Sequence, residues 1–129
     1  MANNKGMSEF VRAYLACGLQ LSEEEEPALA PLSTHDLPQS LVDMADSDCK
    51  LFTAKASLAG LADYVSGEVD GYSEDQAAYD FWLTRNGHGA GFWDRGLGKA
   101  GDRLTTIAQE EFTECTLYVG DDGLPYYGQ

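Results

Sequence analysis

The residues most able to do acid–base chemistry gather in one segment, Asp80–Gly96, which reads DFWLTRNGHGAGFWDRG. A histidine between two glycines, as at His88, has an accessible imidazole ring, and imidazole is the usual group for proton transfer near neutral pH. Asn86, Asp80 or Asp94 would lie nearby, and an Asp could orient that ring. One interpretation of the segment is therefore a small enzyme or ligand-binding protein with a site around His88.

The same segment also has a purely structural interpretation. Trp82, Phe92 and Trp93 are large enough to anchor a core, and the glycines would permit a tight reversal that ends in a short extended piece at residues 92–93. Four charged side chains would brace this reversal as ion pairs: Asp80, Arg85, Asp94 and Arg95. Catalysis also needs a nucleophile or a second acid at a defined distance, and the sequence shows neither. We therefore expect a structural segment in a protein that is not an enzyme.

Carboxylates are the second chemical feature of the chain. There are 22 Asp and Glu against eight Lys and Arg, which gives a net charge of −14. Such a charge disfavours binding to nucleic acid or anionic lipid and favours attraction to a basic protein surface, although acidity can also serve solubility alone. Seven acids are our candidate contacts with a basic partner: Asp43, Asp46, Asp48, Glu68, Asp70, Glu74 and Asp75.

Acids on a helix can stand in for phosphates. A step of three residues advances ~4.5 Å along a helix, and each DNA strand places a phosphate every ~3.4 Å of axis. Asp43, Asp46 and Asp48 on a helix would thus present charge at a density comparable to that of a nucleic-acid backbone. Any acidic helix meets this condition, so the spacing permits mimicry of DNA without specifying it.

No cofactor or metal site is expected. Cys17, Cys49 and Cys115 are far apart and odd in number, which indicates reduced core residues rather than a disulfide scaffold. Two acidic loops, 66–77 and 121–123, lack the ligand set and the closing Glu of an EF-hand.

The sequence also predicts a cytoplasmic protein. No run approaches the ~18 apolar residues of a membrane span. The first residues, Met1–Gly6, lack the apolar core of a secretion signal. We therefore expect no contact with a membrane.

The segment around His88 and the candidate acids must be positioned by helices and strands that the hydrophobic pattern predicts. Ser8 caps a first helix that Gly18 would end, and a surface loop over about 21–37 carries the glutamate run Glu23–Glu26. A long helical region then extends over 38–66, with a break at Gly60. Its apolar stripe recurs at steps of three and four residues: Leu41, Met44, Ala45, Cys49, Phe52, Ala56 and Ala59.

In the C-terminal half, the capping and turn residues predict two more helices and a hairpin. Ser73 and Gln76 form a capping box for a helix that ends at Gly87, and a last helix covers Ala100–Phe112. A β-hairpin follows over about 115–127. The order of elements predicts an α+β fold in one domain, 1–129, with about four helices in a helical part (about 7–112) and a small C-terminal antiparallel sheet.

The segment 80–94 also resembles a block found in small acidic proteins of phages and mobile elements. The stretch LYVGDDG at 117–123 and the opening helix around Phe10–Leu15 are similar to the same family. Some small acidic proteins of this kind are anti-CRISPR inhibitors, including inhibitors of type I-C systems.

This resemblance implies a phage-encoded protein in the cytoplasm of a host bacterium. It implies an inhibitor that binds the basic DNA-binding surface of a type I CRISPR-Cas surveillance complex, type I-C being the expected target. Its acids would occupy the phosphate sites and block target DNA. The resemblance carries no catalytic residues and does not say which carboxylates touch the partner.

Overall fold

The computed structural model of the chain describes residues 6–129, so the stretch read above for a secretion signal lies largely outside the described residues. Within this range five α-helices precede one two-stranded antiparallel sheet, and the α+β prediction is confirmed. The helices are α1 (Glu9–Ser22), α2 (Gln39–Leu58), α3 (Ala62–Ser66), α4 (Glu74–Arg85) and α5 (Lys99–Glu110), and the strands are β1 (Thr116–Val119) and β2 (Pro125–Gly128). Short 3₁₀ helices cover Pro27–Leu29, Thr34–Asp36 and Phe92–Asp94.

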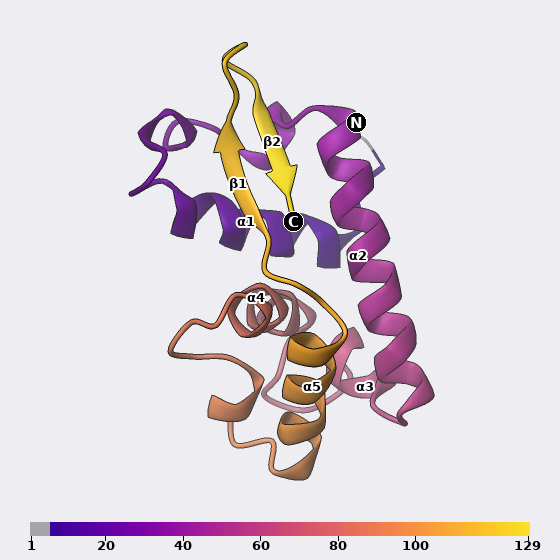
Figure 1. Cartoon of the computed structure of the whole chain (residues 1–129). Coiled ribbons are helices and arrows are strands. Elements are labelled where there is room, and N and C mark those ends of the chain that lie inside the picture. Colours follow the sequence, from indigo (N-terminus) through magenta and orange to yellow (C-terminus); the bar gives the residue numbers. More distant parts are fainter. Residues whose placement is uncertain (1–5) are drawn as a thin grey trace.

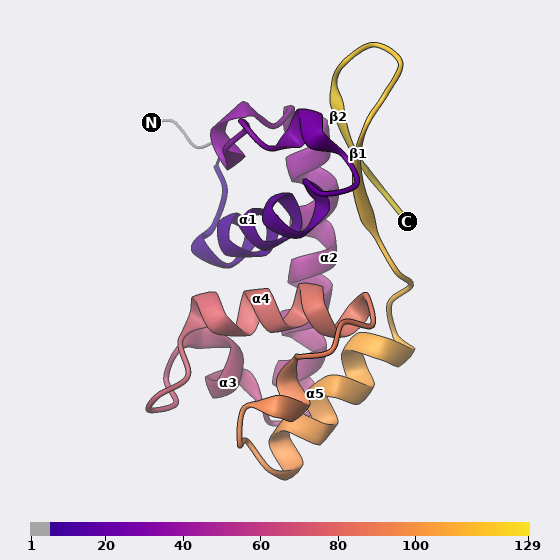
Figure 2. The same ribbon diagram turned by 90° about the vertical axis from the view of Figure 1, so that its left-hand side faces the viewer.

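The helices α1 and α4 lie against each other and run in the same direction, with their first residues together at the left of Figure 2. The long helix α2 runs along the side of the molecule and contacts α1, α3, α5 and β2 (Figure 1). The hairpin covers the far end of α1, while α5 lies below α4. This arrangement brings the starts of α1 and α4 to one end of the molecule.

Both of these helices begin at a serine, as predicted. The Ser8 hydroxyl accepts a hydrogen bond from the Val11 N–H, and the Ser73 hydroxyl accepts one from the Gln76 N–H. Each bond satisfies one of the backbone donors that a helix start leaves without a partner. The Gln76 side chain instead donates to Asp80, so the capping box is only half formed.

The predicted end of the first helix at Gly18 is wrong. The helix α1 continues to Ser22, and Gly18 lies buried in its interior against the indole ring of Trp82. A Cβ at position 18 would lie 2.7 Å from Cη2 of Trp82. The glycine is therefore present because α1 and α4 approach closely, not because the chain turns.

The core is built around stacked aromatic rings. The ring centroids of Phe52 and Phe81 are 4.1 Å apart, and Tyr14 and Phe92 extend the stack on either side. Trp82 and Phe92 are buried as predicted, but Trp93 is 49% exposed and does not anchor the core. The reason is that residues 92–94 form a 3₁₀ turn rather than the expected extended piece, and this turns Trp93 outward.

The loop before α2 is anchored at several points. Leu29 and Leu37 are buried within the predicted loop 21–37, which contains two 3₁₀ turns. A carboxylate oxygen of Glu26 accepts a hydrogen bond from the Val119 N–H at 3.1 Å, which ties the glutamate run to β1. The predicted hairpin is confirmed, with Leu117 paired to Tyr127 on the buried face.

The packing at Gly18 can be tested by Gly18→Ala. Alanine is the better helix former by about 1 kcal/mol, yet we expect a net loss of roughly 1–3 kcal/mol of unfolding free energy because the methyl group overlaps the Trp82 ring. Urea denaturation measures the change. Gly89→Ala is the control, since a Cβ there has no heavy atom within 4 Å. Equal stability of Gly18→Ala and the wild-type protein would show that the contact is not tight.

Candidate interaction surface

The candidate acids on α2 have different environments. Asp43 is exposed and accepts a hydrogen bond from Nε2 of Gln39 at 2.8 Å. Asp46 is partly exposed and forms an ion pair of 2.8 Å with Lys50, one turn further along the helix. Exposed contacts of this kind contribute little stability, so both carboxylates remain available to a cation of a partner.

Asp48 does not belong to this surface. Its side chain is only 15% exposed, and its Oδ2 accepts a hydrogen bond from Nη1 of Arg85 at 2.9 Å. The Tyr127 hydroxyl donates to the same oxygen at 2.6 Å, as does Nε2 of Gln129 at 2.9 Å. The interpretation of Asp48 as a partner contact is therefore not supported, because this carboxylate is held by the folded chain itself.

A second group of candidate acids lies in the turn between α3 and α4 and in the first turn of α4. Glu68 and Asp70 are exposed in the turn that a bridge between Val69 and Tyr72 closes. Glu74 and Asp75 follow in the first turn of α4 and are partly exposed. The turn and the helix start thus present four of the seven predicted carboxylates within eight residues of the chain.

The fold adds one carboxylate that sequence reasoning missed. Glu9, in the first turn of α1, lies beside Asp75 because the two helices start together, and Arg12 bonds both acids at 2.6 Å and 3.2 Å. The only sign of this surface near Glu9 in the sequence is that each capping serine, Ser8 or Ser73, is followed directly by an acid. We name the residues Glu9, Glu68, Asp70, Glu74 and Asp75 the helix-start surface.

The carboxylates of this surface influence one another. Hydrogen bonds from Arg12 and with Asp75 lower the pKa of Glu9 to about 2. Partial burial raises the pKa of Asp75, and the hydrogen bond with Glu9 raises it further. Partial burial and the charges of Glu9 and Asp75 also raise the pKa of Glu74. Arg12 thus favours the charged form of Glu9, whereas burial first and the neighbouring acids second disfavour the charged forms of Asp75 and Glu74. A further cation beside Asp75 and Glu74 would be favourable.

The two groups of acids do not form a single row. Figure 2 shows the start of α4 and the preceding turn at the left edge, whereas the first half of α2 lies near the centre, behind α1. The segment of α2 that carries Asp43 and Asp46 thus lies apart from the start of α4 and the turn before it. The seven predicted carboxylates are therefore divided, with Asp48 in the interior.

The fold brings one acid near the alternative site around His88, because Oε2 of Glu114 lies 4.0 Å from the position of a Cβ at Gly87. His88 is exposed, and in the described part of the chain its ring has no hydrogen bond to a carboxylate. Asn86 accepts from the Cys115 N–H and donates to the Trp82 carbonyl. Asp80 is fully buried and holds Arg95 through two guanidinium nitrogens at 2.8–3.1 Å.

These contacts agree with the structural interpretation of the segment. The predicted bracing by ion pairs is found for Asp80 with Arg95, while Arg85 pairs with Asp48 instead.

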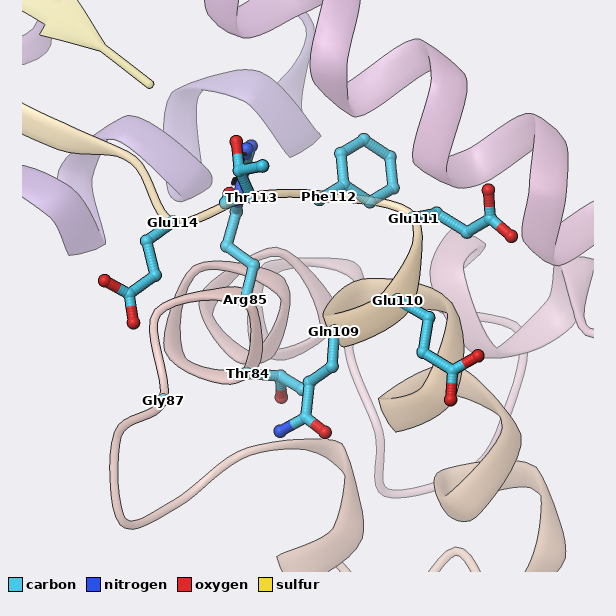
Figure 3. Close-up of a pocket in the computed structure, with 9 residues that line it drawn as sticks. All are labelled: Thr84, Arg85, Gly87, Gln109, Glu110, Glu111, Phe112, Thr113 and Glu114. Atoms are coloured by element: carbon cyan, nitrogen blue, oxygen red, sulfur yellow. Dashed lines mark hydrogen bonds between the residues drawn. The ribbon is translucent and has the colours of Figure 1, made fainter.

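A pocket of about 730 Å³ lies between the end of α4 and the segment that follows α5 (Figure 3). Its basic member, Arg85, points to the Thr113 carbonyl and donates to it at 2.6 Å and 2.9 Å. Glu111 and Glu114 extend away from each other on opposite sides of the pocket. No set of polar groups converges on a common point here, so the pocket has no evident catalytic arrangement.

The described residues 6–129 contain no group of three His, Cys, Asp or Glu side chains placed to hold a metal ion. None of their helices is both long enough and apolar enough to cross a membrane.

The different roles of Asp43 and Asp48 can be separated by replacing each with Asn. Asp48→Asn removes the charge that faces buried Arg85, and we expect a loss of about 3 kcal/mol of unfolding free energy. Asp43→Asn, five residues earlier on the same helix, should change stability by less than about 0.5 kcal/mol. Thermal or urea unfolding compares the two, and equal effects would contradict the internal role of Asp48.

Comparison with protein-family models, with curated proteins and with solved structures finds no match to this chain.

Proposed function

We propose that this chain is a phage-encoded inhibitor of a type I CRISPR-Cas surveillance complex, with type I-C as the expected target. It would occupy the basic surface that binds target DNA and act by binding, not by catalysis. The observation that carries the proposal is the surplus of carboxylates, because 22 acids against eight bases leave fourteen uncompensated even if every base were paired. The resemblance of the segment 80–94 to small acidic phage proteins supports the choice of target.

The helix-start surface is the contact that we propose. It combines two exposed acids, Glu68 and Asp70, with the crowded carboxylates at the starts of α1 and α4. Those carboxylates also offset the partial positive charge of two helix starts. A basic groove lined by Lys and Arg would supply the cations that this end of the molecule lacks. Asp43 and Asp46 on α2 form a second, smaller acidic region.

A charge-driven contact has a defined dependence on salt. Opposite charges steer association at low ionic strength, and salt screens them over a Debye length of about 8 Å at 0.15 M. The affinity for the surveillance complex should therefore fall as salt rises, and bound target DNA should compete with the inhibitor. If the wild-type protein does not co-purify with the complex at low salt, the proposed function is wrong.

The contact surface can be tested with two double variants that change the net charge equally. Glu68→Lys with Asp70→Lys makes the charge of the helix-start surface four units more positive. We expect the affinity for the complex to fall at least about tenfold, which is a loss of about 1.4 kcal/mol of binding free energy. Glu24→Lys with Glu25→Lys makes the same change on the loop before α2 and should weaken binding much less. Titration of the purified complex measures both affinities.

Two other results bear on the assignment. Equal weakening by both double variants would show that only total charge matters, which would contradict the helix-start surface as the contact. His88→Ala should inhibit like the wild-type protein, because the proposal assigns no role to its ring. Loss of inhibition in a folded His88→Ala variant would instead favour the site around His88.

A further inference from the structure

A second pocket, of about 300 Å³, lies between the end of α1 and the strand β1. Ser22, Glu25 and Glu26 line it on the side of α1, and residues 116–118 line it on the side of the strand. We name it the β1-edge pocket. The helix-start surface lies at the opposite end of α1, roughly 20 Å away along this 14-residue helix. A partner bound at the helix-start surface would therefore leave the β1-edge pocket open.

The outer edge of β1, beside this pocket, has one open backbone position. The N–H of Val119 bonds the Glu26 side chain instead of β2, and alternate residues of a strand direct their N–H groups to the same edge. The N–H groups of Cys115 and Leu117 therefore face this edge too. Asn86 accepts from the Cys115 N–H, whereas the Leu117 N–H has no hydrogen bond among the described residues. Side chains thus close the edge on both sides of Leu117 and leave that residue open to another strand.

The surroundings of the pocket are negative and contain no cation. None of the ion pairs that the described residues form includes a member of the glutamate run Glu23–Glu26. Glu25 is exposed, and Glu26 bonds a neutral backbone N–H. The last turn of α1 has no basic residue, so the partial negative charge of the helix end adds to that of the carboxylates. The pocket is therefore complementary to a basic side chain.

We propose that the outer edge of β1 binds an extended segment of a partner protein that carries an arginine. The backbone of this arginine would accept from the Leu117 N–H and donate to the Leu117 carbonyl, as paired residues of an antiparallel ladder do. Opposed residues of such a pair project their side chains to the same face. The arginine would therefore lie on the face of buried Leu117, which packs toward α1.

On that face the guanidinium reaches the β1-edge pocket. The carboxylates of Glu25 and Glu26 line the pocket next to the strand, so both can accept from the guanidinium. Arginine fits better than lysine, because its planar fork presents several donors at once to paired carboxylate oxygens. The strand edge thus selects an extended backbone, and the two glutamates select the charge of the central side chain. This contact does not depend on the proposed inhibition of a surveillance complex.

A short capped peptide, threonine–valine–arginine–valine–threonine, is the probe. Titration of the full chain, followed by the NMR shifts of its backbone amides, should move the Leu117 amide signal and slow its hydrogen exchange. The same peptide with citrulline, which has the shape of arginine without its charge, should bind at least about tenfold more weakly. An N-methyl group on the arginine backbone nitrogen should also weaken binding, because it removes the donor to Leu117. Equal binding of the arginine and citrulline peptides, or of the N-methylated peptide, would overturn the proposal.

Two variants of the chain test the position of the pocket. Glu25→Gln and Glu24→Gln each remove one negative charge from the same run, but only Glu25 lines the pocket. Glu25→Gln should weaken the affinity for the arginine peptide about tenfold, and Glu24→Gln less than about twofold. Urea unfolding should give both variants the stability of the wild-type protein, because both side chains are exposed. Equal weakening by the two variants, or no binding of the arginine peptide to the wild-type protein, would contradict the assignment. The measurement uses no surveillance complex, so its failure and the failure of the proposed inhibition are separate results.

Discussion

The buried guanidinium of Arg85 is the interaction on which the rest of the structure depends. From the last turn of α4 it donates to Asp48 on α2, to the hydroxyls of Tyr14 on α1 and Tyr127 on β2, and to the Thr113 carbonyl. It therefore joins three helices, the hairpin and the segment that leads into it. A buried cation is tolerated only when its donors are satisfied, and each of these partners comes from a different part of the chain.

The scarcity of bases gives this interaction a consequence for the surface. Five bases, Arg12, Lys50, Lys55, Arg85 and Arg95, form ion pairs with the chain's own carboxylates. Because acids outnumber bases by fourteen, no arrangement of the chain could neutralise the remainder internally. The helix-start surface places part of this surplus where two helices begin. Carboxylates stabilise helix starts, so the position that favours folding also displays the acids to a partner.

Local signals in the sequence predicted the elements well. Ser8 and Ser73 start helices because their hydroxyls reach an N–H only three residues away, and Gly87 follows the end of α4 with a positive φ of 71°. The hairpin also follows from its own turn residues. The signals failed where a distant segment decides the outcome: Gly18 continues a helix because Trp82 packs on it, and Met44, predicted to face the core, is 46% exposed.

The sequence by itself therefore determined the net charge, the order of helices and strands, and the positions where most of them begin. Only the tertiary structure decided which carboxylates remain available. Asp43 and Asp48 lie on one helix and are equivalent in type, yet Asp48 meets Arg85 from 37 residues away. Glu9 joins Asp75 because α1 and α4 run side by side. Charge is a sum over residues, whereas availability depends on which distant side chain packing brings within hydrogen-bond distance.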